Sequence, residues 1–154
     1  ARLRVIDCTL SGDHLAVGPL DSADSPLTAA SLARRARVDL IGVTQVGRGL
    51  YLAAGADLVA RDCVFEVRRG RAIEGKFLWG WPDRETARLK TNGVRRPAVV
   101  ARFVRCRFVL PTTSLPGRSS LTRSDAVRVL WGDQPLPDSI VFDGCTINGK
   151  KISS

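Results

Sequence analysis

The sequence is poor in the residues on which most catalytic and metal sites depend. It contains one histidine, His14, and no two of its four cysteines are spaced as Cys-x-x-Cys. A nucleophilic site of the Ser-His-Asp or Cys-His type would have to use His14, and zinc has no suitable set of ligands. A phosphate-binding loop of the GxxxxGKS/T type is also absent. We therefore expect no metal and no cofactor, and we assign no catalytic residue.

Long apolar segments are missing as well. No run reaches about 18 apolar residues, so the sequence predicts no membrane span, and its start lacks the apolar stretch of a signal peptide. The chain has no methionine and starts with Ala1, which fits a processed N-terminus and an excised fragment equally well. Its 154 residues fit a single domain over 1–154, in which residues 12–36 form a non-repeat insertion or cap.

Acidic residues are few compared with basic ones. The chain has 15 aspartates and glutamates against 24 lysines and arginines, which gives a net charge of +9. A basic surface favours anionic partners such as acidic polysaccharide, nucleic acid or an anionic membrane surface. An arginine-rich surface that serves only solubility explains the charge equally well. Because no nucleic-acid-binding motif is recognisable, nucleic acid is the less favoured partner.

What the sequence does contain is a repeated pattern of eight residues. With the cysteine of each copy numbered zero, apolar or small residues occupy positions −5, −3 and 0, and also +2 in four of the five copies. The copies are residues 3–10, 38–45, 58–65, 101–108 and 140–147. All four cysteines of the chain stand at position zero, and Val43 takes that place in the second copy. Scattered cysteines would rarely coincide in this way.

The spacing within each copy predicts two short strands joined by a bend. Positions −5 and −3 alternate as on a strand, and so do 0 and +2. The step from −3 to 0 is odd, so the backbone must bend at −2 and −1. The cysteines then point inward with parallel Cβ directions, which disfavours disulfides. We therefore expect buried, free thiols. We also expect the phenylalanines of the repeats in the core and three arginines at the surface: Arg61, Arg105 and Arg107.

This pattern resembles the right-handed parallel β-helix of the pectate-lyase-like superfamily. The resemblance rests on the five repeats and on the Gly49-Leu50-Tyr51-Leu52 segment, and it covers most of the chain except residues 12–36. It implies an all-β fold, a small right-handed parallel β-helix (solenoid), with a short helix near the N-terminus that covers one end. Residues 27–36 have the composition of such a helix. The superfamily includes lyases, hydrolases, epimerases, viral tailspikes and non-catalytic spacers, so the resemblance specifies the fold better than the activity.

The three tryptophans are the first candidate ligand contacts. Trp79, Trp81 and Trp131 are large for a narrow β interior. Indole rings exposed beside arginine and lysine are suited to stacking on sugars or to covering a protein interface; packing beneath loops is the alternative. Trp79 and Trp131 each stand in a Leu-Trp-Gly segment between two cysteine repeats, which predicts that these two segments are structurally equivalent.

Charged residues supply the other candidates. Asp133, together with Asp83, lies near a Leu-Trp-Gly segment, and such carboxylates serve either as acid and base in glycoside hydrolysis or as caps of turns. Arg88 and Lys90 resemble the Arg-x-Lys element with which β-helix polygalacturonases bind a substrate carboxylate, but the neighbouring acidic and histidine motifs of those enzymes are missing. Arginines at outward positions of adjacent repeats, Arg102 among them, would form a ladder of positive charge.

The sequence favours binding over catalysis. We expect a non-catalytic surface or virion-associated module that binds anionic polysaccharide or acts as a rigid structural or assembly element. It would be located outside the cell, at the cell surface or on a virion. The alternative is a polysaccharide lyase or hydrolase that acts on acidic glycan, so whether the protein is an enzyme stays open. Only seven residues follow the last repeat, which would leave Phe142 and Ile147 exposed. A second copy or a larger assembly is therefore expected to cover that end.

Overall fold

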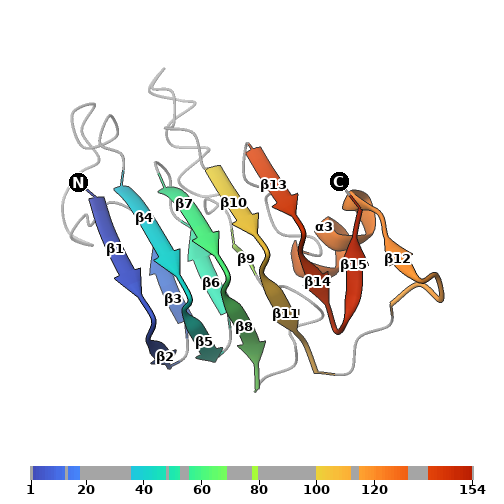
Figure 1. Cartoon of the computed structure of the whole chain (residues 1–154), viewed down its shortest axis with the longest axis horizontal. Helices are drawn as coiled ribbons and strands as arrows, with labels where there is room; N and C mark the ends of the chain where they lie inside the picture. The colour runs from blue at the N-terminus through green and yellow to red at the C-terminus, as the bar shows by residue number, and fades with distance from the viewer. Residues whose placement is uncertain are drawn as a thin grey trace, which may run out of the picture.

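The structure is a computed structural model, and it describes residues 2–12, 14–17, 36–47, 49–52, 56–68, 78–79, 100–111, 115–131 and 139–153. Within these residues the fold is mostly β, with short strands in three sheets and one helix. Five strands form the first sheet, sheet A, in which neighbours follow chain order and run parallel (Figure 1). They are β1 (Arg2–Ile6), β4 (Ala36–Ile41), β7 (Ala56–Arg61), β10 (Val100–Val104) and β13 (Ser139–Asp143).

Seven strands form sheet B, in the order β12-β15-β14-β11-β8-β5-β2. They are β2 (Thr9–Ser11), β5 (Thr44–Gly47), β8 (Val64–Val67), β11 (Arg107–Val109), β12 (Ser120–Leu121), β14 (Thr146–Ile147) and β15 (Lys150–Ile152). Only the pairing of β14 with β15 is antiparallel in this sheet. A third, parallel sheet, sheet C, contains β3 (His14–Val17), β6 (Gly49–Leu52) and β9 (Leu78–Trp79). Strand β3 lies within the stretch 12–36 that we expected to fall outside the repeat.

The bend predicted in each repeat is confirmed. The residue at position −1 has a positive φ in all five copies, at Asp7 (49°), Gly42 (62°), Asp62 (53°), Arg105 (50°) and Gly144 (65°). These residues join each strand of sheet A to the following strand of sheet B, as Figure 1 shows. A residue in the left-handed conformation changes which face of the chain the following side chains point to. For this reason positions −3 and 0, which are three residues apart, can both face the core.

The residues at −5, −3, 0 and +2 form the core as predicted. Phe65, Phe103, Phe108 and Phe142 are buried, and their rings lie 5.2–6.1 Å apart, edge-on or stacked. The exposed positions of Arg61, Arg105 and Arg107 are also confirmed. The first repeat differs because β1 and β2 are edge strands. Its inward residue Leu3 is 58% exposed.

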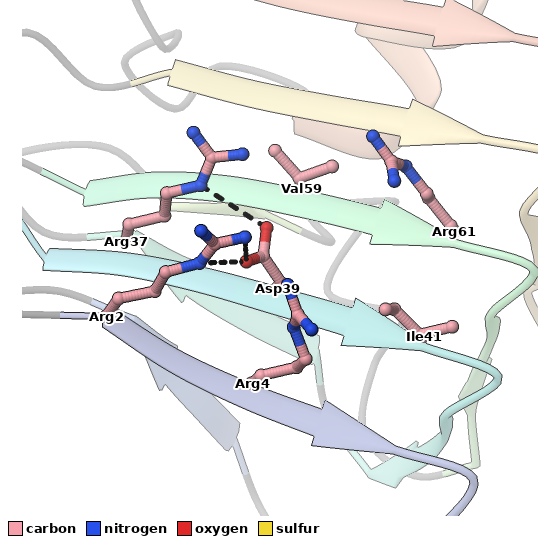
Figure 2. A pocket seen from close by; sticks show the side chains of 7 residues that line it. All are labelled: Arg2, Arg4, Arg37, Asp39, Ile41, Val59 and Arg61. Atoms are coloured by element: carbon pink, nitrogen blue, oxygen red, sulfur yellow. Dashed lines mark hydrogen bonds and ion pairs between the residues drawn. The ribbon is translucent and has the colours of Figure 1, made fainter.

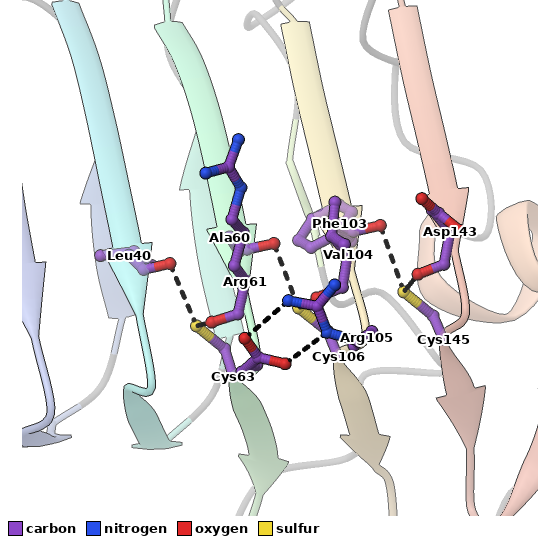
Figure 3. A network of polar contacts seen from close by, with 11 residues as sticks. Leu40, Ala60, Arg61, Cys63, Phe103, Val104, Arg105, Cys106, Asp143 and Cys145 are labelled. Atoms are coloured by element: carbon purple, nitrogen blue, oxygen red, sulfur yellow. Dashed lines mark hydrogen bonds and ion pairs between the residues drawn. The ribbon is translucent and has the colours of Figure 1, made fainter.

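The cysteines are free, as predicted. Cys63, Cys106 and Cys145 are buried, whereas Cys8 in the first repeat is half-buried. Each buried thiol donates a hydrogen bond to a carbonyl of the preceding row, over 3.3–3.4 Å (Figure 3). The mutual influence of the three neighbouring thiols is the first cause that raises the pKa of the central Cys106 and lowers the pKa values of Cys63 and Cys145. The three buried cysteines lie at equivalent positions of successive repeats, and their burial makes them inaccessible as nucleophiles.

The described part of the chain contains one helix, in a place where we expected none. The helix predicted over 27–36 lies, apart from its last residue in β4, outside the part of the chain that the structure describes. Helix α3 (Arg123–Trp131) occupies the C-terminal third. It begins with a reciprocal cap, in which the Asp125 amide donates to Thr122 Oγ1 and the Thr122 amide donates to Asp125 Oδ2, at 3.1 and 3.0 Å. Trp131 ends this helix, whereas Trp79 lies in strand β9, so the two Leu-Trp-Gly segments are not equivalent.

The prediction of a right-handed parallel β-helix is wrong as an account of the whole fold. The described residues form two mainly parallel sheets, of five and seven strands, beside the small sheet C. The succession of repeats is interrupted in the last third, where α3 lies between β12 and β13. After the fifth repeat, the Asn148-Gly149 turn, with φ of 48° and 83°, sends β15 back antiparallel to β14. The expected exposure of the last repeat is also wrong, because Phe142 and Ile147 are buried within the chain. That ground for a second copy at this end is therefore removed.

Candidate anion-binding site

The outward face of sheet A carries a cluster of arginines. Alternation along each strand places every second residue on this face. Those residues are Arg2, Arg4 and Ile6 on β1; Arg37, Asp39 and Ile41 on β4; Asp57, Val59 and Arg61 on β7; and Val100, Arg102 and Val104 on β10. Over these four strands the face combines five arginines with two aspartates. Outward positions of sheet B, such as Thr9, Thr44 and Val64, are mostly uncharged.

Part of this face is hollowed into a shallow pocket of about 70 Å³. Seven residues from three neighbouring strands line it: Arg2, Arg4, Arg37, Asp39, Ile41, Val59 and Arg61 (Figure 2). The guanidinium groups come from β1, β4 and β7, and Asp39, Ile41 and Val59 supply the rest of the lining. We call this the arginine pocket. Four positive charges and one negative charge leave it with a net positive charge.

Asp39 organises two of the four arginines. Its side chain is only 8% exposed although it is on the outward face. Two nitrogens of Arg2 contact Asp39 Oδ2, each at 2.7 Å, and Arg37 Nε contacts Oδ1 at 3.4 Å. Burial acts to raise the pKa of Asp39, but the hydrogen bonds and charges of Arg2 and Arg37 outweigh it and hold this pKa below its usual value. Asp39 is therefore ionised at neutral pH and fixes both guanidinium groups.

The other two arginines keep their donors available. Within the described part of the chain, Arg4 and Arg61 take part in no side-chain hydrogen bond or ion pair. In Figure 2 their side chains lie on either side of Asp39, with Arg4 on β1 and Arg61 on β7. A guanidinium presents several N–H donors in a planar fork that matches a carboxylate, sulfate or phosphate. The pocket can therefore bind an anion between a pair of fixed arginines and a pair of unpaired ones.

Arg105, which follows strand β10 beside the pocket strands, is already bound to Asp62. Its Nε and Nη2 donate to the two carboxylate oxygens of Asp62, at 2.7 and 2.9 Å (Figure 3). The pKa of Asp62 is lowered, first because Arg105 donates hydrogen bonds to it and also because of the charge of Arg105. Both side chains are exposed, so solvent screens their interaction. This pair extends across two neighbouring bends and leaves Arg105 unsuited to binding an external anion.

Of the residues that the sequence singled out for ligand binding, the structure describes only Trp79 and Trp131. Trp131 is fully buried, with its ring centroid 6.3 Å from that of Phe142, and its indole nitrogen has no hydrogen-bond partner among the residues described. Trp79 lies in β9 of sheet C. The remaining four candidates, Trp81, Arg88, Lys90 and Asp133, are outside the residues that the structure describes. Their roles stay predictions.

Sequence reasoning foresaw a ladder of arginines but did not select those of the pocket. The missed signal was alternation: positions −6, −4 and −2 of the first three repeats must face outward once −5 and −3 face inward. Arg2, Arg4, Arg37 and Arg61 occupy four of these nine positions. In the residues covered by the structure, no group of three or more potential ligands could hold a metal ion, and no helix there has the length and apolarity to cross a membrane.

The chain was also compared with known proteins. It matches no family model, no curated protein and no solved structure. The arginine pocket must therefore be interpreted from its own chemistry.

Proposed function

We propose that the protein is a binding module for acidic polysaccharide and that the arginine pocket on sheet A is its binding site. The observation that carries the proposal is the arrangement of Arg2, Arg4, Arg37 and Arg61 around Asp39 on one outward face. Carboxylate or sulfate groups of an acidic glycan match the guanidinium fork, and charge-assisted bidentate contacts are the strong form of such hydrogen bonds. Such a module would act outside the cell, at a cell surface or on a virion.

Binding suits the pocket better than glycoside hydrolysis. Hydrolysis requires a carboxylic acid that donates a proton to the leaving oxygen. Among the residues lining the pocket, Asp39 is the only carboxylate, and two arginines hold its pKa below the usual value. Asp39 therefore has no proton to donate at neutral pH. Its position between Arg2 and Arg37 suits a structural role, in which it orients the cations toward a ligand.

Direct titration tests this proposal. Isothermal titration calorimetry of the chain with a galacturonate hexamer, and separately with a neutral maltohexaose, compares oligomers that differ in charge. We expect binding of the acidic oligomer only, and we expect it to weaken as salt is added because the contacts are exposed to solvent. The double variant Arg4→Gln/Arg61→Gln should bind the acidic oligomer at least about tenfold more weakly, which corresponds to roughly 1.4 kcal/mol.

A matched control separates the pocket from the overall charge. Arg107 is exposed on sheet B, so Arg107→Gln removes one positive charge from a different face. It should leave the affinity for the acidic oligomer unchanged. Equal binding of the neutral oligomer, or an unaltered affinity in the double variant, would rule out the pocket as the glycan site. Tighter binding of a single-stranded oligonucleotide than of the hexamer would assign the basic face to nucleic acid instead.

A further inference from the structure

The positive charge of sheet A continues past the arginine pocket to strand β10. Arg102 lies on the same face, is exposed, and has no side-chain hydrogen bond or ion pair among the residues described. The register pairs Arg4 with Asp39, Asp39 with Val59, and Val59 with Arg102. These four residues therefore form one line perpendicular to the strands. Since neighbouring strands lie about 4.8 Å apart, the Cα atoms of Arg4 and Arg102 are roughly 14 Å apart.

Arg61 lies between the two ends of this line. It is on β7, the strand beside β10, two residues beyond Val59, and its register partner on β10 is Val104. Its backbone is therefore about 8 Å from that of Arg102, one strand across and two residues along. Arg4, Arg61 and Arg102 thus offer unpaired guanidinium groups at intervals across the sheet. Arg2 and Arg37 lie on the same face and are bound to Asp39. We call the five arginines the sheet A track.

The sheet A track ends at β13 and runs across the strands. The next strand, β13, presents Ser139, Val141 and Asp143 on this face, so positive charge is replaced by neutral and negative groups. A ligand that ran parallel to the strands would meet at most two arginines, because β1 offers Arg2 and Arg4 before Ile6 and β4 offers Arg37 before Asp39 and Ile41. A ligand that runs across the strands meets arginine on β1, β4, β7 and β10 in turn.

We infer that the ligand is a linear oligosaccharide with acidic groups on successive sugars, bound across the strands of sheet A from β1 to β10. This inference rests on the proposed function and adds the class and orientation of the glycan. Arg4 and Arg61 bind acidic groups within the pocket, and Arg102 binds a further acidic group outside it. A short acidic sugar fills the pocket alone, whereas a longer one also reaches Arg102. Affinity should therefore grow with the length of the glycan until the track is filled.

Oligomers of different length test this arrangement. The dissociation constants of galacturonate oligomers, from the dimer to the octamer, are measured by calorimetry for the unaltered chain and for Arg61→Gln, Arg102→Gln and Arg107→Gln. Arg102→Gln should bind the dimer normally and lose about fivefold in affinity for the octamer, a typical loss for one exposed ion pair. Arg61→Gln should weaken both oligomers, and Arg107→Gln neither. Thermal denaturation confirms that each surface variant is folded.

The possible results distinguish the two proposals. If no acidic oligomer binds at any length, the proposed function itself fails. If acidic oligomers bind and depend on Arg4 and Arg61, but Arg102→Gln affects dimer and octamer equally or not at all, the function stands and the extended track is wrong. A length-dependent effect of Arg102→Gln alone supports a glycan that lies across the strands.

Discussion

Among individual residues, the one before position zero of each repeat has the most constrained backbone. Left-handed φ values cost little for glycine and roughly 1–2 kcal/mol for most other residues. Asp7, Asp62 and Arg105 nevertheless occupy this position. At Gly42 the absence of a side chain also avoids a steric clash, because a Cβ there would contact Asp7 Oδ1. At Gly144 a Cβ would meet Arg105 Cγ at 3.5 Å, an ordinary contact.

The two glycines therefore give a matched pair of substitutions. Gly144→Ala should destabilise the protein by about 1–2 kcal/mol, the cost of alanine in the left-handed region. Gly42→Ala should cost this amount and more, because the Asp7 carboxylate must also move. Urea denaturation measures both. Removing the carboxylate with Asp7→Ala should bring the Gly42→Ala cost down to that of Gly144→Ala; a persistent difference would mean that the contact with Asp7 is not its cause.

Asp39 makes stability depend on pH. Its pKa is lower in the folded protein than its ordinary value because of Arg2 and Arg37, in spite of burial. A group of this kind stabilises the fold at pH values above its ordinary pKa, and the contribution is lost as the pH falls through the lowered pKa. We expect the free energy of unfolding to fall on acidification from about pH 5 to pH 2. Asp39→Asn should show a smaller fall, measured by urea denaturation at several pH values, whereas an identical fall would contradict this role.

Among the elements, helix α3 is the one that determines how the C-terminal end is covered. Its buried residues Ala126, Val129, Leu130 and Trp131 join the same core as the strands. The reciprocal cap between Thr122 and Asp125 starts it, and the Asp125 carboxylate also binds Arg118 and Arg128 at 3.0 and 3.1 Å. The pKa of Asp125 is lowered, first by the amide and hydroxyl of Thr122 and also by these two charges. The helix thus depends on one side chain at its start.

Removal of the cap should weaken this element. Thr122→Ala loses the side-chain oxygen that accepts the Asp125 amide, and capping losses of this kind cost about 1 kcal/mol. Arg128→Gln serves as the control, because its side chain is 73% exposed and such contacts contribute little. Urea midpoints of the two variants measure the difference. Equal midpoints would show that the cap does not stabilise α3.

The strands of the two sheets meet at the phenylalanine cluster. Phe103 on β10 lies within 5.8 Å, between ring centroids, of Phe65, Phe108 and Phe142. Phe103→Ala should therefore cost about 3–5 kcal/mol through the lost contacts and the cavity. Val109→Ala, at a residue that is 39% exposed on β11, should change stability by less than about 0.5 kcal/mol. A small effect of Phe103→Ala would contradict the central place of this cluster.

Local spacing made the strand pairs and core of all five repeats predictable, but not the helix and the final turn in the last third of the chain. Cys63 and Phe65 define the inward side of a repeat by alternation alone, and the odd step locates the bend at Asp62. The sequence Thr122-Arg123-Ser124-Asp125 contained the signal for a helix start, yet the repeated Leu-Trp-Gly at 130–132 suggested a segment equivalent to 78–80. The arginine pocket needed the register between β1, β4 and β7, which joins residues 20 and 35 positions apart and is set by tertiary packing.

For the whole molecule, the two ends of the strand rows differ. At the C-terminal end, α3 and β15 cover the last repeat, and Phe142 and Ile147 are buried. At the N-terminal end, β1, β2 and β3 are edge strands of their sheets, and Leu3 and Ile6 are 58% and 52% exposed. Local opening is easiest where few apolar contacts hold a segment. We therefore expect the amides of β1 to exchange with deuterium fastest among the strands of sheet A, and those of β10 slowest, as measured by mass spectrometry or NMR.

The sheet A track connects the strand that we expect to open most easily with the strand that we expect to open least. Arg2 and Arg4 belong to the most weakly held strand, whereas Arg61 and Arg102 belong to strands anchored on the phenylalanine cluster. A glycan bound across all four strands would contact β1 and β10 together and so stabilise the edge strand β1 against local opening. Part of its binding free energy would be spent on ordering that edge, so a glycan that spans the track should slow deuterium exchange in β1 more than in β10.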